Sequence, residues 1–234
     1  MTRKWHQRSS IRALLATLLI LLVTLGYPVL NALISHKRQG TDPAAVPTYP
    51  AGMPWDIQRS VDGQVVSVFG LSAGVSTLAD ARRVLGQDLQ IAFLTPPNSA
   101  PVLEAYLDPL RTGPLTGKVI LATDVDFSKV SNWIENSKKR QISETGAKIN
   151  SPAEQDLPQV LMSTISSIHY LPSADLDEAA IVSRFGKPNS RLQSEPDLIL
   201  LRYPEIGLMV TINQHGKELF QYVQPKRFTQ FFPN

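Results

Sequence analysis

The feature that most constrains this chain is an uncharged, apolar stretch at residues 13–35, whose core at residues 14–23 is dense in leucine. An α-helix needs about 20 apolar residues to cross the roughly 30 Å hydrocarbon core of a bilayer. A helix suits that environment because all of its backbone hydrogen bonds are made within the segment. The sequence therefore predicts a single transmembrane helix at residues 13–35, with the lipid bilayer as its partner.

The charges around this segment predict its orientation. Before it lie Arg3, Lys4, Arg8 and Arg12, and after it Lys37 and Arg38. Because positive charge is retained on the cytoplasmic side, we expect residues 1–12 in the cytoplasm. The remainder of the chain then forms a periplasmic, or more generally extracytoplasmic, domain held at the cell inner membrane.

A cleaved signal peptide is the alternative to a retained anchor. Such peptides have an apolar core of about 7–15 residues that ends in a small-x-small cleavage site. The best candidate here, Leu30-Asn31-Ala32, places a bulky leucine where a small residue is required. The length of the run and the poor cleavage site favour retention.

Residues 36–54 read as a linker that separates the anchor from the domain. Pro43, Pro47, Pro50 and Pro54 interrupt regular structure in this segment. Proline-rich linkers run extended and semi-rigid, at roughly 3 Å per residue. We expect this one to hold the domain some distance from the bilayer.

The distribution of charge argues against a nucleic-acid partner. The chain has 23 Lys and Arg against 20 Asp and Glu, but six of the basic residues and no acid lie in residues 1–38. The remaining 17 basic residues leave the domain with a balance of −3, whereas a nucleic-acid-binding domain carries a basic face. The chain also lacks cysteine, which excludes disulfides, thiolate metal sites and a lipidated N-terminal cysteine.

Residues 55–150 read as a first α+β unit. A strand at 64–69 precedes a helix at 79–85, which Ser76 or Thr77 would cap and Gly86 would close. Further strands are expected at 90–94, 102–107 and 118–123. A helix at 127–138, capped by Asp126, would then place Phe127, Val130 and Ile134 on one face.

Residues 151–234 read as a second α+β unit. Ser151-Pro152-Ala153-Glu154 resembles a capping box that leads into a helix at 157–165. A strand at 167–171 and a helix at 178–185, closed by Gly186, precede hairpin strands at 198–203, 208–212 and 219–223. Because Gly86 and Gly186 are 100 residues apart in matching contexts, the sequence suggests that the two units are related by duplication. The fold class is therefore α+β, with helices packed on antiparallel sheet.

The run from Asp175 to Val223 resembles the small domain of the BamE (SmpA/OmlA) family. The resemblance rests on a helix that ends in Phe185-Gly186-Lys187-Pro188 before a β-meander. Proteins of that family are bacterial envelope lipoproteins that support assembly of outer-membrane proteins. The resemblance implies an envelope setting and a fold for about 50 residues; it assigns no functional residue, and this chain has an anchor in place of a lipidated cysteine.

The sharpest catalytic motif is Gly70-Leu71-Ser72-Ala73-Gly74, a G-x-S-x-G between a predicted strand and a predicted helix. In α/β-hydrolases this context exposes a nucleophilic serine, and the later partners here would be Asp175 or Asp197 with His215. Several parallel strands should precede that elbow, but only about one does. We therefore interpret Ser72 as a turn residue and keep a serine hydrolase as the alternative.

No pattern indicates a cofactor or a metal. None of the four histidines, His6, His36, His169 and His215, has a partner at ligand spacing. Asp124 and Asp126 could bind a divalent cation at the end of a strand. Asp126 is, however, already explained as a helix cap.

The tail of the chain is the strongest candidate for binding a partner. Phe228, Phe231 and Phe232 lie within five residues and either pack back onto the domain or form an exposed docking strip. We therefore expect a non-enzymatic envelope protein that binds another envelope protein through a sheet edge or through this tail. A tethered hydrolase and a periplasmic ligand-binding module are the alternatives.

Overall fold

The computed structural model describes residues 52–137, 140–143 and 146–233. The predicted cytoplasmic N-terminus, transmembrane helix and most of the linker lie outside these residues. Within the described ranges, no helix combines the length and the hydrophobicity needed to cross a membrane.

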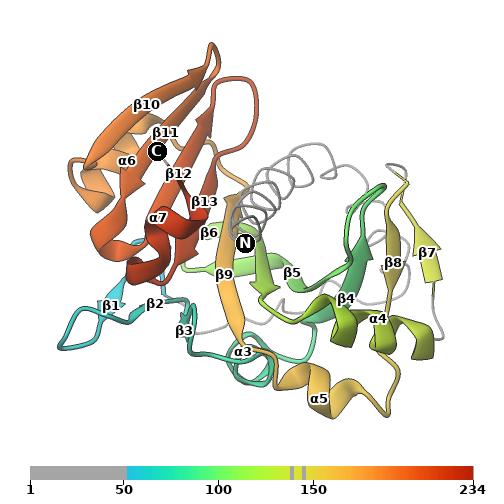
Figure 1. The fold of residues 1–234 in the computed structure, drawn as a ribbon. Helices are drawn as coiled ribbons and strands as arrows, with labels where there is room; N and C mark the ends of the chain where they lie inside the picture. Colours follow the sequence, from blue (N-terminus) through green and yellow to red (C-terminus); the bar gives the residue numbers. More distant parts are fainter. Residues whose placement is uncertain (1–51, 138–139, 144–145, 234) are drawn as a thin grey trace, which may run out of the picture.

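The α+β prediction is confirmed, because the structure is built from antiparallel sheet and short helices (Figure 1). The main sheet runs, from edge to edge, β10 (Ser190–Glu195), β11 (Leu198–Tyr203), β12 (Leu208–Asn213), β13 (Leu219–Val223), β9 (Ile165–Pro172), β6 (Leu115–Thr123), β5 (Val102–Thr112), β4 (Gln90–Thr95), β8 (Lys148–Asn150) and β7 (Arg140–Ile142). A small sheet is formed by β1 (Gln58–Arg59), β2 (Val66–Val68) and β3 (Leu71–Ser72). The helices are α3 (Leu78–Leu85), α4 (Phe127–Asn136), α5 (Leu157–Leu161), α6 (Glu178–Phe185) and α7 (Phe228–Phe231), with 3-10 turns η1 (Pro204–Ile206) and η2 (Pro225–Arg227).

Strand β9 joins the two halves of the chain. It pairs with β6 on one side and with β13 on the other, and all eight of its residues are buried. Strands β4 to β8, from residues 55–150, and strands β10 to β13, from residues 151–234, therefore belong to one continuous sheet, with β9, itself from the second half of the chain, between the two groups.

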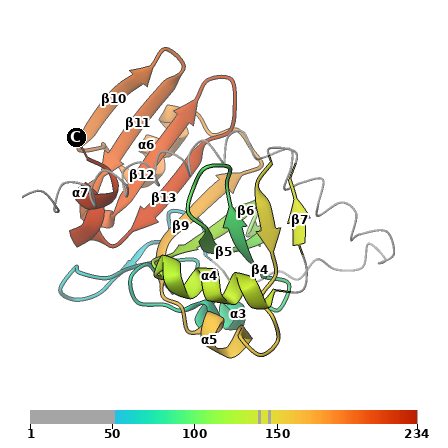
Figure 2. The same cartoon turned by 45° about the vertical axis from the view of Figure 1, so that its right-hand side comes forward.

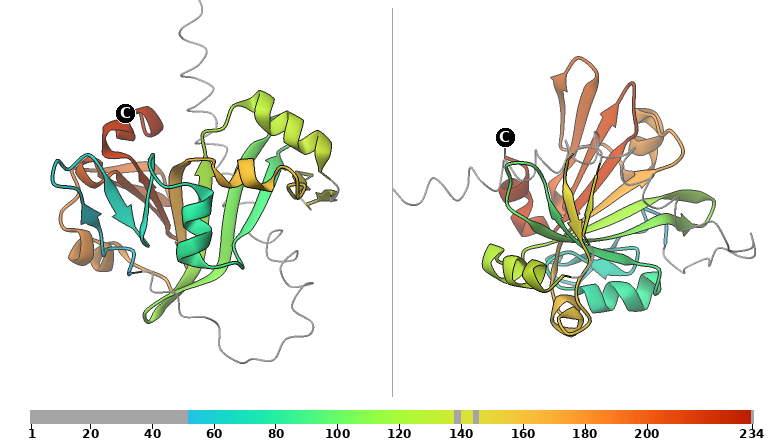
Figure 3. Two further views of the ribbon diagram at one scale, coloured as in Figure 1. Left: turned by 90° about the horizontal axis from the view of Figure 1, so that it is seen from below. Right: turned by 90° about the vertical axis from the view of Figure 1, so that its right-hand side faces the viewer.

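The two faces of this sheet are covered differently. On the face that we call the main core face, α3, α4, α5 and α6 and the small sheet contribute to one large hydrophobic cluster. Figures 2 and 3 show α3, α4 and α5 together on one side of β4, β5 and β6. On the opposite face, which we call the second face, α7 packs with Met209 and Val223.

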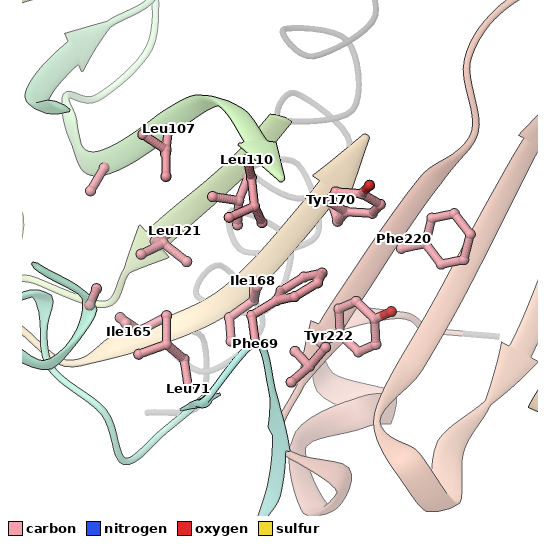
Figure 4. Packing of buried hydrophobic residues seen from close by; sticks show 14 of the residues in the cluster. Phe69, Leu71, Leu107, Leu110, Leu121, Ile165, Ile168, Tyr170, Phe220 and Tyr222 are labelled. Atoms are coloured by element: carbon pink, nitrogen blue, oxygen red, sulfur yellow. The ribbon is translucent and has the colours of Figure 1, made fainter. Parts of the chain in front are cut away.

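A strained aromatic residue fastens the small sheet to the main one. Phe69 and Gly70 connect β2 to β3 with φ values of 54° and 73°, as in the two-residue turns that match the twist of a hairpin. A positive φ is uncommon for phenylalanine. The Phe69 ring lies 5.2 Å from the Tyr170 ring and 6.5 Å from the Tyr222 ring, so packing compensates for the backbone strain (Figure 4).

Helices α3 and α6 have the same local design. Each has eight residues, the two are offset by 100 positions, and each begins with a side-chain cap, from Thr77 or Asp177. Each ends at a glycine whose φ is positive and whose ψ is near 180°, a region that essentially only glycine occupies: Gly86 at 90°, 175° and Gly186 at 81°, −174°. Both helix predictions are confirmed.

Two other helix predictions need correction. The Ser151–Glu154 capping box does not begin a helix: α5 begins only at Leu157 and ends at Leu161. The chain after α5 is needed elsewhere, since Ser163 accepts a bond from the amide of Leu78 and Ile165 already belongs to β9. Helix α4 begins as predicted, but Trp133 rather than Phe127 is buried beside Val130.

Candidate functional site

The structure places Ser72 at the buried end of strand β3, directly before the turn at residues 73–75. Its side chain is 8% exposed, and its hydroxyl lies 2.5 Å from that of Ser67 on the neighbouring strand. The amide of Ser72 donates to the Ser76 hydroxyl, while Gly74 and Ser76 form backbone bonds with Ile165 at the start of β9. The glycine-rich motif therefore fastens the chain before α3 to the central strand.

The histidine and aspartate that a hydrolase would require lie elsewhere. His215 and Asp197 do come together, with 3.5 Å between the His215 Nε2 and a carboxylate oxygen, but both are exposed, Asp197 in the turn between β10 and β11 and His215 in the turn between β12 and β13. The turn between β12 and β13 adjoins the Pro172 end of β9, whereas Ser72 adjoins the Ile165 end. Eight strand residues separate the two ends by roughly 25 Å. The geometry supplies Ser72 with no general base at hydrogen-bond distance among the described residues.

We expect Ser72→Ala to lower the free energy of unfolding by about 1 kcal/mol or less, because it removes one hydroxyl contact in a partly buried pair. Urea unfolding of the purified protein measures the change. A fluorophosphonate probe should leave the wild-type chain unlabelled. Labelling of the wild type that disappears in Ser72→Ala would contradict this interpretation and establish a reactive serine.

The aromatic tail folds back onto the second face. Phe228 and Phe232 are 2% and 5% exposed, and their ring centroids lie 5.0 Å apart. The Arg202 guanidinium holds the end of the chain by donating to the carbonyl oxygens of Phe232 and Pro233. Of the three predicted docking residues, only Phe231 remains partly exposed, so the other two could contact a partner only if the tail detached.

The carboxylates considered as cation ligands have other roles. Asp124 pairs with Arg227 at 2.7 Å, which ties the end of β6 to the turn before α7. Asp126 precedes α4 as its N-cap residue, although its side chain makes no capping hydrogen bond. Within the described ranges, no three His, Asp or Glu side chains are grouped as metal ligands.

A groove at one edge of the main sheet is the most accessible candidate site. It has a volume of about 530 Å³ and lies between α4 and the β7–β8 hairpin. A second hollow of about 460 Å³ continues from it and shares Thr95, Phe127 and Lys148. We call the two together the edge groove.

Large apolar side chains line the edge groove while remaining exposed. Phe127 is 58% exposed and Ile142 is 73% exposed, and Ile134 and Pro101 line the groove between them. Glu135 and Lys148 place one charge of each sign at its rim. The sequence indicated Phe127 and Ile134 as a buried helix face. Only one sequence feature indicates this groove. Phe127, an apolar residue, occupies the first position of a helix, and the strand that follows is short and has little hydrophobic alternation.

A second candidate is a row of buried polar side chains on the second face, which we call the polar strip. It comprises Glu104 on β5, Ser167 and His169 on β9, Thr211 on β12 and Gln221 on β13, each 2–7% exposed. The Ser167 hydroxyl and the His169 Nε2 lie 2.8 Å apart and share a hydrogen bond. Among the described residues, the His169 Nδ1, the Gln221 Oε1 and the Thr211 Oγ1 find no hydrogen-bond partner.

Burial changes the ionisation of two groups in the polar strip. Desolvation raises the pKa of Glu104 from 4.5 to about 7, because a carboxylate loses its hydration in the interior. Desolvation also lowers the pKa of His169 from 6.5 to about 4, so the imidazole is neutral at physiological pH. Sequence patterns did not indicate this strip, because its members come from four strands far apart in the chain.

Comparison with known proteins gives no relative for this chain. No protein-family model matches it, and neither does any curated protein or solved structure.

Proposed function

We propose that this chain is a non-enzymatic envelope protein, anchored in the cell inner membrane by residues 13–35, whose extracytoplasmic domain binds another envelope protein. The anchor is supported by 23 uncharged residues with basic flanks and by the proline-rich linker that follows. The resemblance of residues 175–223 to a family of envelope lipoproteins supports the same setting. The matching caps of α3 and α6 support our further proposal that the two units arose by duplication.

The observation that carries the binding proposal is the edge groove. Two of the six large hydrophobic side chains exposed in the described residues, Phe127 and Ile142, line this one hollow. Single exposed apolar residues are ordinary, whereas apolar residues gathered in a groove commonly mark a contact site. A groove of this volume at the end of a sheet can take several side chains of a partner.

The position of the groove beside strand β7 indicates how a partner would bind. β7 is the last strand of the main sheet, paired with β8 on one side. An extended segment of a partner can add to such an edge through backbone hydrogen bonds while its alternate side chains enter the adjacent groove. We therefore propose an extended segment with at least one apolar side chain as the bound element.

The opposite edge of the sheet has a different character. Strand β10 is exposed along nearly its whole length and carries Arg191, Gln193 and Glu195. Arg191 also pairs with Glu178 of α6. Charged edge strands oppose pairing with other chains. The two edges therefore provide a binding edge and a matched non-binding control.

A photoreactive amino acid placed at Gln141 in the full-length protein, expressed in its native membranes, tests this proposal. Gln141 is exposed and lines the groove. We expect one defined crosslinked protein, at least tenfold more abundant than that obtained from the same probe at Leu192 on β10, which is 43% exposed. Phe127→Ser should reduce the Gln141 adduct to the level at Leu192 and leave the fold intact, because Phe127 is largely exposed.

Several outcomes would contradict the proposal. Equal adducts at Gln141 and Leu192 would show that the edge groove has no special role. A small molecule that co-purifies in the groove would favour the periplasmic ligand-binding module, since volumes of 300–1,000 Å³ also suit small ligands. In the same cells, release of a soluble product shortened by about 32 residues would replace the retained anchor with a cleaved signal.

A further inference from the structure

The second face carries hydrogen-bonding groups that the described residues do not use. His169 and Gln221 are direct cross-strand neighbours on β9 and β13, and both are 2% exposed. The His169 Nδ1 and the Gln221 Oε1 are nevertheless without a hydrogen-bond partner among the described residues. The Thr211 Oγ1, on the next strand, β12, also has no hydrogen-bond partner among the described residues. Because unpaired buried polar atoms are costly, a surface with three of them favours an occupant that brings complementary groups.

Apolar side chains surround these polar atoms on the same face. Ile120, Leu171 and Leu219 form a separate hydrophobic cluster, and Tyr106 packs against it. The strip and this cluster together form a largely apolar surface crossed by a short row of donors and acceptors. The same surface carries Lys118, the cross-strand neighbour of Leu171, which pairs with Asp108 at 3.2 Å. An apolar helix with a row of uncharged polar residues along one side would match this surface.

The chain itself contains such a segment. Within residues 13–35, the uncharged polar residues include Thr17, Thr24, Asn31 and Ser35. With 3.6 residues per turn, these four positions fall within an arc of about 40° if the segment is helical. The predicted anchor is thus apolar around most of its circumference and polar along one narrow stripe. A helix does not need such a polar stripe to cross a membrane.

The connecting chain is long enough to bring the two together. The linker joins the domain at Pro54, whose carbonyl oxygen accepts a hydrogen bond from the Tyr222 hydroxyl at 2.8 Å. Residues 36–51 can span about 50 Å when extended. Strand β9 is only about 25 Å long, so residues 36–51 are long enough to lead from Pro54 around to the polar strip beside β9.

We propose that residues 13–35 have a second binding place, the second face of their own domain, where Thr17, Thr24 and Asn31 meet the polar strip. The segment occupies this place when no bilayer is available and leaves it on insertion into the membrane. The domain then shields its own anchor from water until lipid is reached. This inference goes beyond the binding role proposed above and does not depend on the edge groove.

A cysteine scan of the full-length chain tests this proposal, because the natural sequence contains no cysteine. One cysteine replaces Leu219 on the second face, and a second is moved one position at a time through residues 16–29. The protein is synthesised without lipid and oxidised. We expect intramolecular disulfides to form with helical periodicity, at least tenfold more at Thr17, Leu21 and Thr24 than at Leu19, Leu22 and Val23 on the other side of the helix.

Lipid and a stripe variant provide the controls. Vesicles of phosphatidylethanolamine and phosphatidylglycerol, added before oxidation, should abolish the disulfides as the chain enters the bilayer. The triple variant Thr17→Leu, Thr24→Leu, Asn31→Leu should still insert into vesicles. Without vesicles, it should form at least tenfold less disulfide than the chain that keeps Thr17, Thr24 and Asn31. This variant separates docking from anchoring, because added leucine strengthens membrane insertion.

Three results would overturn the proposal. Disulfides that form equally around the helix would show non-specific collapse, and disulfides between two chains would assign the second face to another copy. A triple variant that retains full yield would show that the polar strip does not recognise the stripe. Failure of docking would leave the anchor proposal intact, since insertion into vesicles is measured separately.

Discussion

Gly207→Ala is expected to destabilise the protein more than a methyl group added at any other glycine of the described residues, by about 3 kcal/mol or more. Gly207 ends the η1 turn with φ 63° and ψ 24°, a conformation that costs other residues about 1–2 kcal/mol. A Cβ at this position would also lie 1.9 Å from the Val223 carbonyl oxygen. That oxygen belongs to the backbone at the end of β13, so relief requires two strands to separate.

The matched control for Gly207→Ala is Gly63→Ala. Gly63 has a similar φ of 67°, but a Cβ there would meet no atom within 4 Å. We expect the free energy of unfolding of this variant to fall only by the cost of a positive φ for a residue other than glycine, about 1–2 kcal/mol. Urea unfolding of both purified variants measures the difference. Equal losses would show that the close approach of Val223 contributes nothing to stability.

Glu104→Gln is expected to stabilise the protein at pH 8 by about 3 kcal/mol, because glutamine needs no proton to remain neutral in the interior. In the wild type, the pKa of Glu104 is about 7 when folded against 4.5 ordinarily. Between these values the folded state keeps a proton that the unfolded chain has lost. Stability therefore falls as pH rises from 4.5 to about 7 and stays constant above that.

His169 has the opposite pH dependence. The pKa of His169 is about 4 in the folded protein against 6.5 ordinarily. The stability that neutral His169 contributes is therefore fully present above pH 6.5 and is lost as pH falls to about 4. Between pH 4.5 and 6.5 the loss of stability due to Glu104 and the gain due to His169 nearly cancel in the wild type as pH rises. We expect Glu104→Gln to unmask a stability that rises with pH over this range, by roughly 1.4 kcal/mol per unit.

Denaturation at a series of pH values measures these slopes. Glu205→Gln, at an exposed position, should follow the wild-type curve and control for the loss of a charge. A Glu104→Gln curve parallel to the wild type would show that Glu104 is hydrated in the folded protein. Its place in the polar strip would then have to be revised.

Elements whose signals are local were predictable from the sequence. Helices α3 and α6 were located because Thr77, Asp177, Gly86 and Gly186 act within one turn of each helix end. The hairpins of β11, β12 and β13 were located because strands separated by a few residues pair with each other. In both cases the information lies within about ten residues.

Elements that depend on distant neighbours were missed. Strand β10 reads as a polar loop, because only its pairing with β11 makes its exposed residues extended. Strands β7 and β8 are three residues each, too short to show a period of two. The central position of β9 could not be predicted, because it depends on pairing with β6, which lies more than 40 residues earlier.

The same distinction applies to the candidate sites. The local sequence predicts Ser72 to be a turn residue, and the structure places it one position earlier, at the end of β3, where it pairs with Ser67. The edge groove combines α4 with a hairpin that sequence patterns did not reveal. The polar strip was hidden because strand residues that face one side are brought together only by sheet register.

The shared strand β9 sets an order in which the domain can be completed as its chain emerges. Strand β6 is finished at Thr123, but its neighbour begins only at Ile165, and β9 in turn acquires its second neighbour only at Leu219. Until then each strand presents an open edge to other chains. A domain that crosses a membrane in chain order, behind an anchor that stays in the bilayer, would therefore remain vulnerable to mispairing until nearly its last residues had crossed.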